Sequence, residues 1–179
     1  MQNMKSKIVW FTGLSGSGKT TLSFFISKKL KKKKFKVKII DGDIFRKKNN
    51  TNKFTKKEIT KNNLQIIRYI DNLRKNYDYV IVSVISPLEK TRRYAYKKFK
   101  SSYFEVHTKC NLKELIKRDP KKLYDKAKKN IIKNLIGFNS KIKYEQSNHK
   151  KLVIDTSKNN KAICSKTVLN YVLKNEKNY

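Results

Sequence analysis

Short apolar runs alternate with amphipathic stretches along the first half of the chain. The run Lys7 to Thr12 is apolar and predicts a buried strand, and from Thr21 to Leu30 apolar residues recur every three or four positions, as in a helix. Val37 to Ile40 predicts a second buried strand, followed by a polar stretch through Asn52. The same helical spacing then predicts a helix from Thr55 to about Lys75.

The second half repeats this alternation. Tyr77 to Ile85 is the most strand-like run of the chain. The tetrapeptide Ser86 to Glu89 has the S-x-x-E pattern of a capping box with proline at the first helical position, which predicts a helix from there to about Phe99. The remaining predicted elements are strands at Tyr103 to Val106 and Leu152 to Ile154, and a closing amphipathic helix at Ala162 to Leu173.

Strands that alternate with helices, without internal repeats, predict an α/β fold: three layers, with a parallel sheet flanked by helices. A length of 179 residues suits one domain with a substantial core, so we expect a single domain over 1–179. Ligands of such folds bind at the carboxyl ends of the strands.

Apolar runs and cysteines limit the class of protein. No apolar run approaches the roughly 20 residues that a bilayer span requires, and Met1 to Lys7 has no signal-peptide core after it. Cys110 and Cys164 lie far apart, without the spacing of a disulfide framework or a zinc site. We therefore expect a cytoplasmic protein without membrane attachment.

The chain is strongly basic. Its 46 Lys and Arg against 13 Asp and Glu give a net charge of +33, which attracts phosphates, RNA and anionic membranes alike. The lysines are spread along the whole chain together with many Asn, Ile and Tyr, a skew that favours drift toward AT-rich codons over selection for a polyanionic partner. The charge alone does not identify a partner.

One motif carries clear chemistry. Gly13 to Thr20 fits G-x-x-x-x-G-K-[ST] and lies between a predicted strand and a predicted helix, the context of a phosphate-binding P-loop. Its backbone N–H groups surround phosphates, Lys19 reaches the β- and γ-phosphates, and the Thr20 hydroxyl ligates Mg²⁺. This context disfavours a merely structural glycine-rich turn. The candidate ATP-binding residues are Gly13, Leu14, Ser15, Gly16, Ser17, Gly18, Lys19, Thr20 and Thr21.

Two carboxylates follow the second strand. Asp41 and Asp43 lie where they would face the γ-phosphate, to orient an acceptor hydroxyl or Mg²⁺; alternatively, they cap the next helix. The third strand ends in Ser83 and Ser86, without the acid often found at that position. Metal binding therefore depends on Thr20, phosphate oxygens, water and this acidic pair.

These blocks together resemble the adenylylsulfate kinase family over nearly the whole chain. The matching blocks are W-F-T-G-L-S-G-S-G-K-T-T at Trp10 to Thr21, D-G-D-x-x-R at Asp41 to Arg46, V-S-x-I-S-P at Val82 to Pro87, R-D-P-K-x-L-Y at Arg118 to Tyr124, Ile132-Lys133, Tyr144-Glu145 and I-D-T at Ile154 to Thr156. The resemblance implies ATP-dependent phosphorylation of the 3′-hydroxyl of adenosine 5′-phosphosulfate, in sulfate assimilation. It also implies a homodimer.

The resemblance assigns roles at the acceptor side. It implies that Asp43 is the base or the Mg²⁺-organising carboxylate, and that Phe54 stacks on the substrate adenine. The other substrate-binding residues that it implies are Asp41, Arg46, Asn62, Ile85, Ser86 and Lys133. An arginine facing a phosphate or sulfate and an aromatic ring against a base suit such a ligand.

The resemblance also implies a mobile basic lid at approximately 118–146, where Arg118 and Lys133 meet phosphate charge. Ser86 matches a position that the family treats as a phosphoserine in some bacterial members, so it joins Asp43 and Lys19 as a candidate catalytic residue. Direct in-line transfer needs no phosphoenzyme, and the predicted capping box explains Ser86 structurally.

The chain departs from the family pattern at two substrate positions. Ile59 stands where the family places an arginine, and Leu135 where it places a second aromatic residue beside the adenine. These changes bear on substrate affinity more than on the type of reaction.

Two other functions fit parts of the sequence. Another small-molecule or nucleoside kinase on the same fold fits the P-loop but not the D-G-D-x-x-R and R-D-P-K-x-L-Y blocks. A nucleic-acid-binding protein fits the charge, but no RNP, KH, zinc-finger or helix-turn-helix signature is present. We therefore expect no specific nucleic-acid partner.

Overall fold

The chain folds around one parallel sheet. The structure is a computed structural model that describes residues 6–49 and 54–174. The strands are β1 (Lys7–Thr12), β2 (Val37–Asp41), β3 (Tyr79–Ser83), β4 (Tyr103–Lys109) and β5 (Lys151–Asp155). Every pairing is parallel, and the order across the sheet is β2-β3-β1-β4-β5. The predicted α/β architecture is confirmed.

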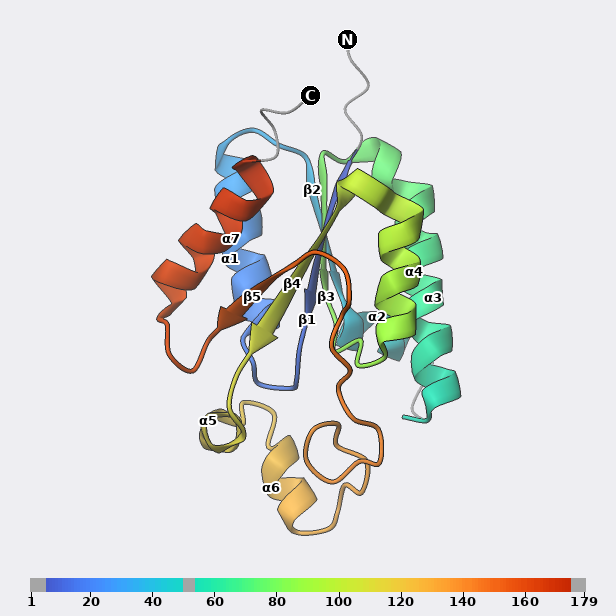
Figure 1. Cartoon of the computed structure of the whole chain (residues 1–179), viewed down its shortest axis with the longest axis vertical. Helices are drawn as coiled ribbons and strands as arrows, with labels where there is room; N and C mark the ends of the chain where they lie inside the picture. The colour runs from blue at the N-terminus through green and yellow to red at the C-terminus, as the bar shows by residue number, and fades with distance from the viewer. Residues whose placement is uncertain (1–5, 50–53, 175–179) are drawn as a thin grey trace.

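Helices cover both faces of this sheet (Figure 1). The α-helices are α1 (Lys19–Lys32), α2 (Gly42–Lys48), α3 (Lys56–Leu73), α4 (Glu89–Phe99), α5 (Leu112–Arg118), α6 (Leu123–Lys128) and α7 (Lys161–Lys174). Helices α1 and α7 lie on one face, and α3 and α4 on the other. Short 3₁₀ turns, Arg74–Asn76 and Lys100–Ser102, follow α3 and α4.

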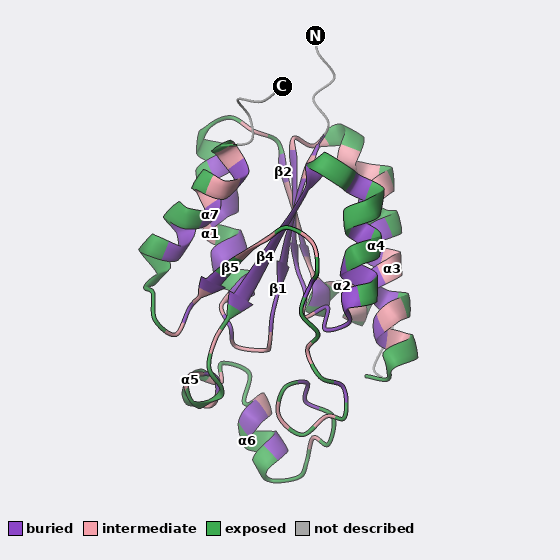
Figure 2. Cartoon of the chain, in the orientation of Figure 1, coloured by how far each residue is buried: buried purple, intermediate pink, exposed green. Residues whose placement is uncertain are grey.

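The central strand β1 shows why its sequence is apolar throughout. Val9 and Phe11 pack in the core on the α1 and α7 side, whereas Ile8 and Trp10 pack with α3 and α4. A strand covered on both faces needs apolar residues at successive positions rather than at alternate ones. Figure 2 shows the inner strands as buried, between helices that each have an exposed side.

Part of the polar stretch after β2 forms helix α2. Helix α2 begins there because the Asp41 carboxylate accepts hydrogen bonds from the amides of Asp43 (2.9 Å) and Ile44 (3.3 Å). The alternative of a capping role is thus confirmed for Asp41. The rest of the predicted polar stretch, residues 50–53, lies outside the described residues.

The predicted capping box at the start of α4 is wrong. The helix begins at Glu89, and Ser86 has a left-handed backbone (φ 44°) three residues earlier. The amide of Glu89 donates instead to the carboxylate of Glu145, at 2.6 Å. A side chain from another part of the chain thus caps the helix.

The predicted lid extends from the carboxyl ends of the strands. It contains the end of α5, helix α6 and an irregular segment that leads to β5 (Figure 1). Tyr124, Ala127 and Leu135 of the lid form a small apolar core together with Leu115 of α5. None of the helices within residues 6–49 and 54–174 combines the length and apolar character of a membrane span.

Candidate active site

The P-loop connects β1 to α1 in a conformation that only glycine tolerates at its first position. Gly13 has φ 139°, and a Cβ atom there would lie 2.5 Å from the carbonyl oxygen of Thr108 on β4. Because the loop approaches the neighbouring strand this closely, its path is fixed by the sheet. The loop then enters α1 through Gly18, also left-handed.

Three other elements hold the loop in place. The Ser17 and Thr108 hydroxyls are hydrogen-bonded at 2.7 Å, and the Thr156 hydroxyl donates to the Ser17 carbonyl at 3.1 Å. The Tyr124 hydroxyl donates to the Ser15 carbonyl at 3.0 Å. Residues from β4, from the end of β5 and from the lid thus preorganise the loop for binding phosphate oxygens.

Lys19 is nearly buried at the centre of this arrangement. Its ammonium group donates to the Leu14 carbonyl at 2.7 Å. Burial is the largest influence on its pKa, and with repulsion from Lys121 it outweighs attraction to Asp43 and Asp41, which lowers the pKa to about 8. A phosphate group would supply the negative charge that this ammonium lacks.

The Thr20 hydroxyl lies against oxygen atoms from two strands. It donates to the Asp41 carboxylate at 3.1 Å and lies 3.3 Å from the Ser83 hydroxyl, because Asp41 and Ser83 are paired across β2 and β3. Such a hard, all-oxygen set suits Mg²⁺. Among the described residues no group of three or more His, Cys, Asp and Glu forms a metal site, so phosphate oxygens and water would complete the coordination.

Asp43 lies in the first turn of α2 and pairs with Lys121 of the lid. Burial raises the pKa of Asp43, but the hydrogen bond and charge of Lys121, together with Arg46 and Lys19, outweigh it and hold the pKa below its ordinary value. Asp43 is therefore an ionised acceptor at neutral pH. Both side chains are more than half exposed, so this ion pair is weak.

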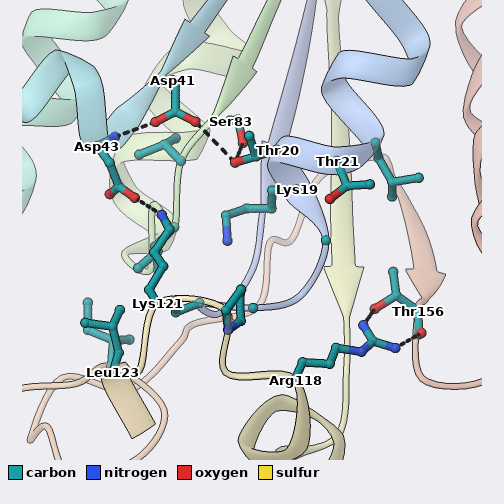
Figure 3. Close-up of a pocket in the computed structure, with 18 of the residues that line it drawn as sticks. Lys19, Thr20, Thr21, Asp41, Asp43, Ser83, Arg118, Lys121, Leu123 and Thr156 are labelled. Atoms are coloured by element: carbon teal, nitrogen blue, oxygen red, sulfur yellow. Dashed lines mark hydrogen bonds and ion pairs between the residues drawn. The ribbon is translucent and has the colours of Figure 1, made fainter. Parts of the chain in front are cut away.

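These residues line a cavity of about 710 Å³ at the carboxyl ends of the strands. Five cations and two carboxylates border it: Lys19, Arg46, Arg118, Lys121 and Lys161, with Asp41 and Asp43. Figure 3 shows Asp43 and Lys121 on one side of Lys19, and Arg118 with Thr156 on the other. The cavity therefore suits polyanionic ligands on both sides of the P-loop lysine.

The Arg118 side is held by several hydrogen bonds. The Arg118 guanidinium donates to the Thr156 carbonyl at 2.6 Å and to its hydroxyl at 3.3 Å, and it forms an ion pair with Glu114 at 2.9 Å. Thr156, at the end of β5, also holds the P-loop. This contact places the Arg118 guanidinium beside the P-loop.

The Asp43 side continues into a second, smaller cavity. Arg46 and Phe54 border both cavities, with the guanidinium 4.5 Å above the ring centre. Asn62 and Ile85 also line the smaller one. Arg46 Nε and Asn62 Oδ1 are buried without hydrogen-bond partners in the part of the chain that the structure describes. Unsatisfied polar atoms of this kind are costly and fit a site that binds a polar ligand.

The structure brings together most of the predicted site, but not all of it. Lys133 is exposed and lines neither cavity. Ser86 borders the smaller cavity but is only 1% exposed, and its hydroxyl lies 3.4 Å from that of Thr91. The two departures from the family pattern are buried in apolar clusters, Ile59 with Ile136 and Ile142 of the lid, and Leu135 in the lid core.

Sequence reasoning missed two residues of the site. Lys121 contacts Asp43, whereas Arg118 and Lys133 had been singled out as the lid cations. Thr156 holds both the P-loop and Arg118. Both residues lie within the R-D-P-K and I-D-T blocks. These blocks indicated that the two segments belong to the site, but they did not indicate which side chains Lys121 and Thr156 contact.

Comparison with known proteins agrees with this geometry. The family described as adenylylsulphate kinase matches residues 5–155 of the chain. The chain belongs to the adenylylsulphate kinase family. Membership of a kinase family confirms the phosphotransferase that the P-loop predicted, together with its nucleotide, ATP.

Individual members of the adenylylsulphate kinase family match over most of their length. A probable adenylyl-sulfate kinase of Archaeoglobus fulgidus is 38% identical over 157 residues, 87% of this chain and 99% of that protein. An adenylyl-sulfate kinase of Clostridium acetobutylicum is 32% identical over 173 residues, 96% of this chain and 86% of that protein.

A solved structure matches the fold. The Mycobacterium tuberculosis APS kinase in complex with AMPPNP and APS superposes with a TM-score of 0.82 at 28% identity, covering 95% of this chain and 98% of that one. That protein therefore binds an ATP analogue and adenylylsulfate together on this fold.

Proposed function

We propose that this protein transfers the γ-phosphoryl group of ATP to the 3′-hydroxyl of adenosine 5′-phosphosulfate. The products are ADP and 3′-phosphoadenylylsulfate, the activated sulfate of assimilation. The observation that carries the proposal is the cavity with a P-loop lysine at its centre, a cationic wall on each side and an ionised Asp43 on one side only. That asymmetry distinguishes a donor side from an acceptor side.

ATP occupies the P-loop and the Arg118 side in this proposal. The loop amides and Lys19 hold its β- and γ-phosphates, and Lys19 exchanges the Leu14 carbonyl for phosphate oxygens. Arg118, held by Thr156, contributes a fixed guanidinium at this end of the cavity. Thr20 and Asp41 would hold Mg²⁺ with their oxygen atoms, and the ion would neutralise phosphate charge.

Adenylylsulfate occupies the side of Asp43 and the smaller cavity. Phe54 stacks on its base, while Arg46 Nε and Asn62 Oδ1, which lack partners among the described residues, supply polar contacts. Lys121 leaves Asp43 for the negative charge of the bound nucleotides. Ile85 and Ser86 form the wall behind the substrate, and Ser86 needs no covalent role.

The transfer itself is a direct displacement. The acceptor oxygen bonds to the γ-phosphorus as the bond from that phosphorus to the β,γ-bridging oxygen breaks, and ADP leaves with the electron pair. Asp43 orients the acceptor hydroxyl and accepts its proton. Lys19, Lys121 and the loop amides stabilise charge on the transferring group, so catalysis depends on positioning and electrostatics.

The test is ADP release from ATP and Mg²⁺ with and without adenylylsulfate, with adenosine monophosphate, gluconate and shikimate as control acceptors. We expect adenylylsulfate to stimulate ADP release and the three control acceptors to leave it unchanged. Asp43→Asn keeps the shape but removes the proton acceptor, so kcat is expected to fall by about 10²- to 10⁴-fold.

Asp125→Asn is the matched control, because Asp125 is a lid carboxylate that pairs with Lys129 and does not line the cavity. It should leave kcat within about twofold of wild type, as expected for an exposed ion pair of little energetic weight. Stimulation by gluconate or shikimate, or no stimulation by adenylylsulfate in a protein that binds ATP, would refute the proposed acceptor.

A further inference from the structure

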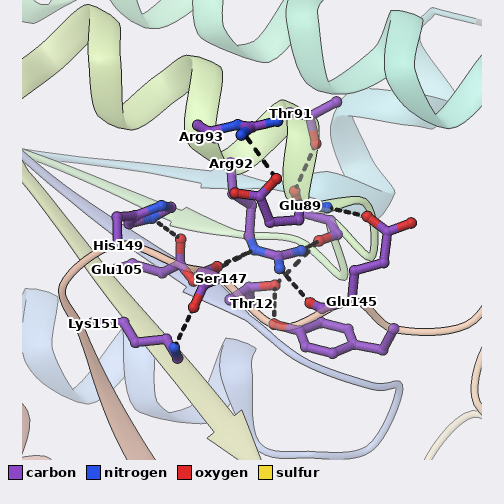
Figure 4. A network of polar contacts seen from close by, with 12 residues as sticks. Thr12, Glu89, Thr91, Arg92, Arg93, Glu105, Glu145, Ser147, His149 and Lys151 are labelled. Carbon is purple, nitrogen blue, oxygen red and sulfur yellow. Dashed lines mark hydrogen bonds and ion pairs between the residues drawn. The ribbon is translucent and has the colours of Figure 1, made fainter.

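A fully buried arginine lies behind the acceptor wall and lines neither cavity. Arg92 of α4 has no exposed surface. Its two terminal nitrogens donate to the backbone carbonyls of Ser86 and Glu145, and its Nε donates to the Ser147 hydroxyl at 2.9 Å. One side chain thus binds two segments that are more than 50 residues apart in the sequence (Figure 4).

The charge of Arg92 is balanced by a buried carboxylate. Glu105 of β4 is also fully buried and lies 3.4 Å from Arg92 Nε. The Ser147 hydroxyl donates to the same carboxylate, and His149 Nε2 lies 2.8 Å from its other oxygen. Buried ion pairs persist only when the remaining polar atoms are satisfied, as they are around this carboxylate.

Further hydrogen bonds join the same two segments. The Glu145 amide donates to the Pro87 carbonyl at 2.8 Å, and the Glu145 carboxylate accepts from the Glu89 amide. The hydrogen bond between the Tyr144 and Thr12 hydroxyls, at 2.9 Å, also joins the second segment to β1. Arg92 lies at the centre of this junction, with its guanidinium 4.9 Å from the Tyr144 ring centre.

The two segments that Arg92 joins belong to different parts of the molecule. Residues 85–87 form part of the wall of the smaller cavity. Residues 144–147 are the point where the lid returns to the sheet. The lid contributes Ile136 to the same cavity, so a change at the junction shifts two walls of the acceptor site relative to each other.

We propose that Arg92 is a positioning residue for the acceptor. By holding the Ser86 and Glu145 carbonyls it fixes the acceptor wall and the lid relative to each other, without touching either substrate. The inference rests on the proposed function in taking adenylylsulfate as the ligand of this side. The ATP side has contacts that do not involve Arg92: Thr108 and Thr156 bind Ser17, and Thr156 binds Arg118.

Arg92→Met is therefore expected to raise the KM for adenylylsulfate about 10- to 100-fold while the KM for ATP stays within about twofold, since small misplacements of a binding wall have effects of this size. Arg93→Met is the matched control. Arg93 is the next residue on α4, its side chain is 53% exposed and it pairs with Glu89. It should leave both KM values unchanged.

Arg92→Met also leaves Glu105 buried without its cation, which destabilises the fold. The double variant Arg92→Met/Glu105→Gln removes both charges. If Arg92 only balances charge, the double variant recovers both thermal stability and the wild-type KM for adenylylsulfate, which would overturn the proposal. If Arg92 positions the wall, the double variant recovers stability while the KM stays raised, because the two carbonyls still lack their donor.

Amide hydrogen exchange gives a readout that does not depend on the reaction. The Glu145 amide, bonded to the Pro87 carbonyl, is expected to exchange at least about tenfold faster in the double variant than in wild type, while amides of β1 keep their protection. Unchanged exchange at Glu145 would overturn the positioning role. If wild type itself shows no stimulation by adenylylsulfate, the proposed function fails and exchange alone decides the role of Arg92.

Discussion

Lys19 is a cation held in surroundings that disfavour its charge. Burial lowers its pKa to about 8, although Asp43 and Asp41 partly counteract this. Among the residues that the structure describes, the acceptor of its ammonium group is the Leu14 carbonyl, an uncharged oxygen. The lysine is thus prepared for a phosphate, whose charge restores the protonated form.

This predicts proton uptake on ATP binding. With a pKa of about 8, Lys19 is neutral in about a quarter of molecules at pH 7.5 and in about nine-tenths at pH 9, and bound phosphate reprotonates it. Uptake should rise between these pH values by about 0.7 protons per ATP. Calorimetry in buffers of different ionisation enthalpy measures it, and uptake that does not rise with pH would contradict this account of Lys19.

At the scale of elements, one contact of the lid on the acceptor side is a weak ion pair with α2. Lys121, between α5 and α6, pairs with Asp43 on α2, and both side chains remain half exposed. On the same side, Ile136 and Ile142 of the lid pack against Ile59 of α3. Because an exposed ion pair contributes at most about 1 kcal/mol, a ligand readily displaces Lys121 from Asp43.

Lys121→Met is therefore expected to affect catalysis far more than stability. Loss of one charge-assisted contact to the bound nucleotides should lower kcat/KM for adenylylsulfate about 10- to 100-fold. The free energy of unfolding should change by less than about 1 kcal/mol. Steady-state kinetics and urea unfolding measure the two effects.

Lys126→Met is the control for this substitution, as Lys126 is exposed on α6 and does not line the cavity. Its kcat/KM should match wild type. Equal losses in the two variants would mean that general lid charge, rather than the contact of Lys121 with Asp43, is responsible.

At the scale of the whole molecule, the junction that contains Arg92 also couples stability to pH. His107 of β4 is buried and stacks on Tyr144, with ring centres 4.7 Å apart. Burial is the largest influence on its pKa, and the positive charge of Arg92 adds to it, so that the pKa falls to about 4.

Homodimer formation, the cytoplasmic location and the single domain stay predictions at this scale.

The native protein should therefore lose stability in mild acid. Between about pH 6.5 and pH 4 the unfolded chain binds a proton at His107 that the folded chain does not, so the free energy of unfolding falls as pH falls. The loss from this group reaches about 3 kcal/mol. Urea unfolding of wild type and His107→Gln at pH 7 and 4.5 isolates this contribution, and the same pH dependence in both proteins would exclude His107 as its source.

Sequence by itself determined the sheet, most of the helices and the P-loop. The apolar runs that became β1 and β3 and the helical spacing that became α3 are local signals, since strand and helix periods are properties of a few neighbouring residues. The glycines of the P-loop are also a local signal. Each left-handed backbone conformation requires glycine at one position only, whatever the rest of the chain does.

Only the tertiary structure decided how α4 is capped, which lid cation reaches Asp43 and what Arg92 binds. The local pattern predicted Ser86 as the cap, but the side chain that accepts from α4 is that of Glu145. Lys121 and Arg92 reach partners more than 50 residues away. Such contacts depend on how packed elements meet in space, and a run of neighbouring residues does not contain that information.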